Sequence, residues 1–215
     1  MTTEISMPLG TASLHFLARR LQLCFLIVFV LINTALFLNA VPGIHDTHDI
    51  KPLHPTYAGA ADGQRYWGVA KNLIERGTFQ YEYAPGDLRP LQRGGPVAPL
   101  VYAGLMKLIG FDNAPLLIVT LQCLLLYLVS LLSRSLAAPF LVNRDLVQGL
   151  ILFNPSLIGL AHHAQSEMLF LLFFTLLLCF CLRLLATNKH PRNLFLFIGI
   201  SSGLVLLTRP AGLPF

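Results

Sequence analysis

Apolar runs that are long enough to cross a bilayer recur along this chain, and they constrain its fold more than any other feature. A membrane-spanning helix needs about 20 mostly apolar residues, because the hydrocarbon core is about 30 Å thick and a helix rises about 1.5 Å per residue. Spans are expected over residues 21–41, 115–133, 146–161, 168–186 and 194–213. The sequence therefore predicts an all-α, polytopic membrane protein with about five transmembrane helices.

The third and fourth of these spans come from one apolar stretch, residues 146–186, which is too long for a single helix. The polar sequence His-His-Ala-Gln-Ser-Glu at 162–167 interrupts it, and a lipid-facing helix would not carry such a sequence. We expect two spans that meet at this polar turn. Asn154-Pro155 is expected to kink the first of them, because proline removes a helical hydrogen bond.

The composition supports a membrane protein and excludes other classes. Hydrophobic residues make up 55% of the chain and charged residues 12%, whereas a soluble domain carries about 25% charged residues. The high apolar content also excludes a disordered chain. The net charge of +5 is ascribed to topology rather than to nucleic-acid binding. All four cysteines lie in apolar runs, which favours neither a disulfide framework nor a zinc site.

The basic residues of the short loops predict the orientation of the chain. Seven of them fall on one side of the expected spans: Arg19, Arg20, Arg134, Arg144, Arg183, Lys189 and Arg192. By the positive-inside rule this side, including residues 1–20, is cytoplasmic. The loop 42–112 and the polar turn 162–167 then face outward, and a bacterial inner membrane is the expected location.

The outer loop 42–112 holds seven of the ten acidic residues. Its middle has helical periodicity, so we expect an interfacial helix that Asp62 caps and Gly77 ends. The buried face would carry Tyr66, Val69, Ala70, Leu73 and Ile74. Residues 78–83 should be extended and residues 85–87 should form a turn. The apolar segment 97–109 is too short to span, which predicts a second interfacial helix.

Several motifs occur in a specific order along the chain. Asp62-Gly63-Gln64-Arg65-Tyr66 follows the first span, and Arg93 and Pro96 come next. Asn154-Pro155, Ser166-Glu167 and Arg209-Pro210 complete the series. This order resembles the amino-terminal portion of the GT-C glycosyltransferases, in the branch similar to aminoarabinose transferases and protein mannosyltransferases (family 39-like). The resemblance covers about residues 20–215, so that residues 21–215 would form a partial GT-C transmembrane domain.

The resemblance implies an enzyme that transfers a hexose or pentose from a polyprenyl-phosphate donor. Its acceptor would be a lipid, a glycan or a protein at the outer face of the membrane. Asp62 then matches the catalytic aspartate of the first loop, and Glu167 the acid of the second outer loop. Arg93 matches a basic residue that contacts the donor phosphate, and the nearby Arg89 is a second candidate. A carboxylate can accept the proton of an acceptor hydroxyl, and arginine can hold a phosphate bidentately.

Other interpretations of the same residues stay open at this point. Asp62 can be a helix cap alone, and the two arginines can form a rim that attracts lipid headgroups. No metal is assigned with certainty: the family leaves a divalent cation open, and His163 and Glu167, four residues apart, are weak candidate ligands. The chain could also be a non-enzymatic membrane protein, such as a transporter or scaffold fragment, or an inactive truncated GT-C remnant.

Overall fold

A computed structural model describes residues 11–40, 61–91, 94–111, 113–140, 143–187 and 192–209, without the side chains of residues 11–18, 37–40, 61 and 62. The described part is mostly helical, as the sequence predicts, and contains eight helices and one two-stranded sheet. The helices are α1 (Thr11–Ala40), α3 (Ala61–Arg76), α4 (Val97–Ile109), α5 (Ala114–Ala137), α6 (Arg144–Leu152), α7 (Pro155–Ala161), α8 (Glu167–Ala186) and α9 (Arg192–Thr208); the strands are β1 (Gln80–Ala84) and β2 (Asp87–Pro90).

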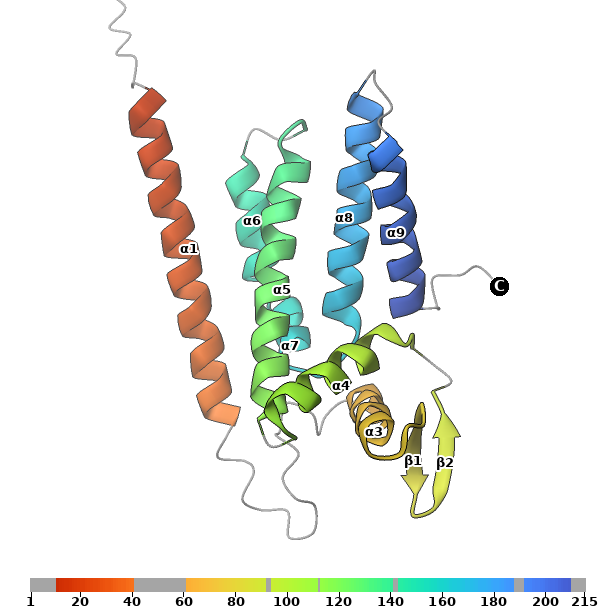
Figure 1. Ribbon diagram of the computed structural model, residues 1–215. Coiled ribbons are helices and arrows are strands. Elements are labelled where there is room, and N and C mark those ends of the chain that lie inside the picture. The colour runs from red at the N-terminus through yellow and green to blue at the C-terminus, as the bar shows by residue number, and fades with distance from the viewer. Residues whose placement is uncertain are drawn as a thin grey trace, which may run out of the picture.

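The long helices run side by side and nearly parallel (Figure 1). Among the described residues, three helices are long and apolar enough to cross a membrane: α1 over Arg19–Leu36, α5 and α8. The apolar helices α4 and α9 are shorter, with 13 and 17 residues. The chain therefore has the character of a membrane protein, while the expected number of five spans stays a prediction.

The segment expected to span as residues 146–161 consists of two short helices. Helix α6 has nine residues and α7 has seven. Between them, the Asn154 side chain accepts hydrogen bonds from the backbone N–H groups of Ser156 and Leu157, at 2.9 and 3.2 Å. Pro155 then takes the first helical position, where its missing N–H costs nothing. Asn154-Pro155 thus starts a new helix, which is a larger interruption than the expected kink.

The basic residues of the short loops gather at one end of the bundle. In Figure 1 the amino-terminal ends of α1, α6 and α9 and the carboxyl-terminal ends of α5 and α8 all lie at the top. The described basic residues at this end are Arg19, Arg20, Arg134, Arg144, Arg183 and Arg192. The structure thus places together the residues on which the predicted orientation depends.

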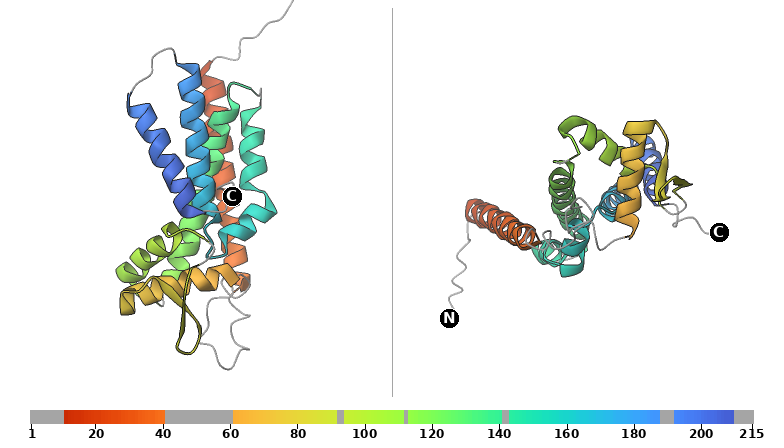
Figure 2. Two further views of the ribbon diagram at one scale, coloured as in Figure 1. Left: turned by 90° about the vertical axis from the view of Figure 1, so that its right-hand side faces the viewer. Right: turned by 90° about the horizontal axis from the view of Figure 1, so that it is seen from below.

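Helices α3 and α4 and the hairpin β1–β2 lie across the opposite end of the bundle (Figures 1 and 2). The predicted faces of α3 are confirmed: Tyr66, Val69 and Ala70 are buried, whereas Lys71 and Glu75 are exposed. The buried side chains pack within the described core, so α3 is covered by protein on this face.

The predicted ends of these elements are mostly correct. Gly77 has a φ of 66° directly after α3, as expected for a helix stop. The extended segment is β1, which pairs antiparallel with β2 across a turn at Pro85-Gly86. Asp62, however, is the second residue of α3 and does not precede the helix as a cap.

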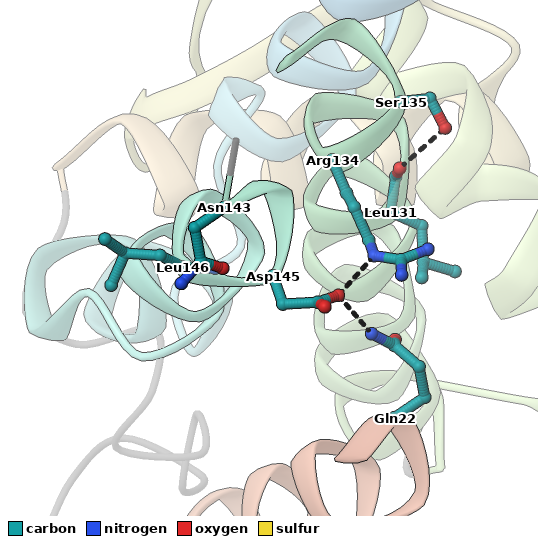
Figure 3. Close-up of polar contacts among 7 residues, drawn as sticks. All are labelled: Gln22, Leu131, Arg134, Ser135, Asn143, Asp145 and Leu146. Carbon is teal, nitrogen blue, oxygen red and sulfur yellow. Dashed lines mark hydrogen bonds and ion pairs between the residues drawn. The ribbon is translucent and has the colours of Figure 1, made fainter. Parts of the chain in front are cut away.

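Helix α1 stands at the edge of the bundle and is held by a few specific contacts. At the basic end, Asp145 of α6 accepts hydrogen bonds from Arg134 Nε of α5 at 2.6 Å and from Gln22 Nε2 of α1 at 3.2 Å (Figure 3). Nearer the other end, the Asn33 side chain contacts His162 Nε2 at 2.9 Å. These polar contacts, at two heights along α1, therefore fix the position of α1 relative to α6 and to the turn after α7.

The two ends of the bundle should be accessible from opposite sides of the membrane. In intact cells, a membrane-impermeant maleimide is expected to label Tyr83→Cys, because the Tyr83 side chain is exposed in the hairpin. Asn143→Cys, at the basic end, should be labelled only after permeabilisation. The unmodified protein is the control, because its four cysteines lie in the helices α1, α5 and α8. Labelling of both variants in intact cells would contradict the predicted orientation.

Candidate functional site

The turn between α7 and α8, residues 162–166, is buried at three residues and half-buried at His163 and Gln165. Tyr102 Oη of α4 donates to the backbone carbonyl of Gln165 at 2.8 Å, and Gln122 Nε2 of α5 donates to Tyr102 Oη at 2.8 Å. Tyr102 and Gln122 are both buried, with exposed fractions of 1% and 2%. These hydrogen bonds within the protein satisfy the Gln165 carbonyl and the Tyr102 hydroxyl where water has little access. The turn is therefore held in place from α4 and α5.

Helix α3 reaches the same turn through Tyr66. Its hydroxyl lies 3.2 Å from Ser166 Oγ, and both residues are buried. Tyr66 also lies against Gly94: a Cβ atom on Gly94 would overlap the Tyr66 hydroxyl. Gly94 has a φ of 103°, a backbone conformation that residues other than glycine rarely adopt. Tyr66 thus joins α3 to both Ser166 and the segment before α4.

Gly95 brings this same segment against the end of α9. The Gly95 N–H donates to the carbonyl of Thr208 at 3.1 Å. A Cβ atom at Gly95 would overlap the carbonyl oxygen of Leu207. Glycine, which has no side chain, permits this close backbone approach.

The carboxylate of Glu167 forms an ion pair beside these contacts. Arg209 Nη1 lies 3.3 Å from Glu167 Oε1, and the side chains are 46% and 19% exposed. The second oxygen, Oε2, is buried and has no hydrogen-bond partner in the described structure. Glu167 therefore keeps one oxygen for a further contact, while Arg209 remains accessible.

Four segments that the sequence singled out thus meet at one end of the bundle. They are the first turns of α3, the Gly94-Gly95 segment, the turn that ends at Glu167, and Thr208-Arg209 at the end of α9. Asp62 lies one helical turn before Tyr66 in α3, so its backbone is adjacent to this cluster. The cluster of these four segments is called the outer-end site below.

Of the two candidate phosphate-binding arginines, the structure describes Arg89. Arg93 lies outside the described residues but directly precedes Gly94 of the outer-end site. Arg89 is engaged within the hairpin: its guanidinium pairs with Asp87 at 2.6 Å and stacks on Tyr83 at 4.0 Å. The hydrogen bond with the Asp87 carboxylate raises the pKa of Arg89 above its ordinary value. Arg89 is therefore held within the hairpin, and the phosphate-binding role of Arg93 stays a prediction.

The weak metal candidates do not form a ligand set. His163 lies in the non-helical turn, so its four-residue separation from Glu167 does not place both on one helix face. Glu167 pairs with Arg209, and a cation next to that guanidinium would be repelled. Within the described ranges, no three His, Cys, Asp or Glu side chains are grouped closely enough to hold a metal ion.

Two members of the outer-end site, Arg209 and Tyr66, make contacts that sequence reasoning did not assign, and so does Gln122, which supports the turn from α5. A buried amide in an apolar span is a recognisable signal, because such a group needs a partner in the protein. Its partners, Tyr102 and the Gln165 carbonyl, are distant in sequence and could not be deduced from it.

Comparison of the chain with known protein families, with curated proteins and with solved structures finds no match.

Replacing Gly95 with alanine should destabilise the protein, because the new methyl group must displace the backbone at the end of α9. Overpacking of this kind costs about 1–3 kcal/mol. The measurement is the thermal midpoint of the purified protein in detergent. Gly104→Ala is the matched control: nothing lies within 4 Å of that position in α4, so alanine should stabilise by about 0.5–1 kcal/mol. A similar midpoint for both variants would contradict the close approach at Gly95.

The Glu167–Arg209 pair should appear as coupling in a double-mutant cycle. Glu167→Gln and Arg209→Gln each leave a charged partner behind, whereas the double variant leaves none. Because Arg209 is half exposed, solvent weakens the pair, and we expect a coupling energy of about 0.5–1 kcal/mol. Unfolding in a denaturing detergent measures it. Additive effects of the two substitutions would show that the pair does not contribute to stability.

Proposed function

We propose that this protein is a membrane glycosyltransferase of the GT-C type. It moves a sugar from a polyprenyl-phosphate donor to a lipid, glycan or protein acceptor at the outer face of the membrane. The observation that carries the proposal is the outer-end site. Segments separated by 100 residues or more along the chain, and singled out by their order in the sequence, come together there.

The reaction assigned to the site is a direct displacement. An acceptor hydroxyl attacks the anomeric carbon, a new carbon–oxygen bond forms, and the bond from the anomeric carbon to the phosphate oxygen breaks. Asp62 takes the hydroxyl proton as general base, a role that contributes typically 10²–10⁴-fold to rate. The polyprenyl phosphate leaves as an anion, and the sugar inverts its configuration.

The leaving phosphate needs a positive charge that is accessible from the membrane surface. Arg93 takes this role, supported by its position beside Gly94-Gly95, where the backbone packs closely on α9. Glu167 is the second acid of the site, and its carboxylate pairs with the half-exposed Arg209 at the same end of the bundle. Arg89 is left out of the reaction because Asp87 and Tyr83 engage it in the hairpin.

A membrane-surface enzyme accounts for the distribution of charge better than a transporter does. Transporters tend to place ionisable groups and broken helices near the midplane. In this chain the acidic residues of the site lie at one end of the bundle, beside α3 and α4 (Figure 1). The positive-inside rule makes that end the outer face, and a bacterial inner membrane supplies polyprenyl-phosphate-linked sugars.

Asp62→Asn tests the proposal directly. Membranes that contain the protein are given undecaprenyl-phosphate-linked hexoses and pentoses with a radiolabelled sugar, and both label transfer and released undecaprenyl phosphate are measured. The unmodified protein should consume at least one donor, and Asp62→Asn should lower the rate by at least about 100-fold.

Glu75→Gln is the matched control for this experiment. It removes a carboxylate from the same helix, but Glu75 lies on the exposed face, where it pairs with Lys71. Its rate should equal that of the unmodified protein. Full activity of Asp62→Asn would exclude Asp62 as the base, and no consumption of any donor by the unmodified protein would contradict the glycosyltransferase.

A further inference from the structure

A groove runs between α1 and α6 at the basic end of the bundle. The outer-end site lies at the opposite end of the bundle. The groove has a volume of about 510 Å³, within the range of about 300–1,000 Å³ of small-molecule pockets. Helix α1 contributes Leu21 and Phe25, and α6 contributes Leu146, Gly149 and Leu150. The groove extends from Asn143, before α6, to Asn154-Pro155, after it.

The length and the walls of the groove suit a hydrocarbon chain. Helix α6 has nine residues, which rise about 13 Å, close to half of the roughly 30 Å hydrocarbon core. Leu146 and Leu150 are 57% and 64% exposed, so the wall formed by α6 is open to the surrounding lipid. Gly149 of α6 faces the Phe25 ring of α1. Because Gly149 has no side chain, space remains between α1 and α6 at this point. The groove thus spans one leaflet.

Basic residues flank the mouth of the groove, while the charged residue of its lining is Asp145. Arg19 and Arg20 of α1 directly precede Leu21 in the chain. Arg144 lies between Asn143 and Asp145, two residues of the lining, and Arg19 and Arg144 are exposed. The acid in the lining, Asp145, is already paired with Arg134 (Figure 3). The charge presented to a ligand at the mouth is therefore positive.

We infer that this groove binds an anionic phospholipid, with the phosphate at Arg144 and one acyl chain against Phe25 and Gly149. A zwitterionic lipid offers the same chain but no net charge, so the basic mouth discriminates between the two. Basic pockets between helices on the cytoplasmic side are known to bind such headgroups. The inference does not rest on the glycosyltransferase reaction, because none of these residues belongs to the outer-end site.

Native mass spectrometry of the full chain in detergent tests the inference. The protein is titrated with phosphatidylglycerol and, separately, with phosphatidylcholine that has identical acyl chains. Phosphatidylglycerol should bind with the lower Kd. Arg144→Gln should raise that Kd about fivefold, the effect of about 1 kcal/mol per arginine near a membrane surface. Equal Kd values for the two lipids would overturn the inference.

Two matched controls separate a specific site from general attraction. Arg192→Gln removes a basic residue from the same end of the bundle but from α9, away from the groove, and should leave the Kd unchanged. Gly149→Leu should abolish binding by filling the groove. Gly149→Ala should largely keep it, because a Cβ atom there meets Phe25 at an ordinary 3.5 Å. An equal loss in Arg192→Gln, or normal binding by Gly149→Leu, would also overturn the inference.

Discussion

Non-helical backbone that is shielded from water must find its hydrogen bonds inside the protein, and this constraint governs the turn between α7 and α8. The carbonyl of Gln165 is satisfied by Tyr102, which Gln122 supports in turn. Tyr66 contacts Ser166, and Asn33 contacts His162. Side chains from α1, α3, α4 and α5 therefore converge on five residues. The arrangement of these helices around the turn follows from the need to satisfy it.

This convergence also explains why the outer-end site lies where it does. Tyr66 of α3 contacts Ser166 of the turn, and the chain before α4 passes close to Tyr66 because Gly94 has no side chain. Gly95 then meets the end of α9, where Arg209 pairs with Glu167. Packing that satisfies the turn thus also brings this ion pair to the same end of the bundle. The same contacts serve stability and, in the proposed enzyme, substrate binding.

Local features of the fold could be predicted from the sequence, and long-range pairings could not. The bounds 97–109 of α4, the end of α3 at Gly77 and the hairpin turn follow from periodicity, glycine and proline. Hydropathy located α5 and α8, but it did not distinguish one kinked span from the helices α6 and α7, because both patterns are equally apolar. The capping geometry of Asn154 decides that question.

For the candidate site, too, local patterns indicated individual residues but not their long-range partners. The order of motifs indicated candidate site residues such as Arg93 and Glu167. The close contact of Gly95 with Leu207–Thr208 depends on how α9 packs, which no local pattern specifies. The spacing of His163 and Glu167 suggested a shared helix face, and this interpretation is wrong because the turn between them is not helical.

The hydrogen bond from Gln22 to Asp145 has a consequence for the biogenesis of the protein. The two residues are 123 positions apart, and ribosomes add about 5–20 residues per second. Helix α1 therefore enters the membrane roughly 6–25 s before its partner is synthesised. During this delay it must persist as a lone helix in lipid, which its exposed Leu23, Ile27 and Leu31 allow. Gln22 and Asn33 are polar enough to recruit the later helices, yet too few to prevent insertion.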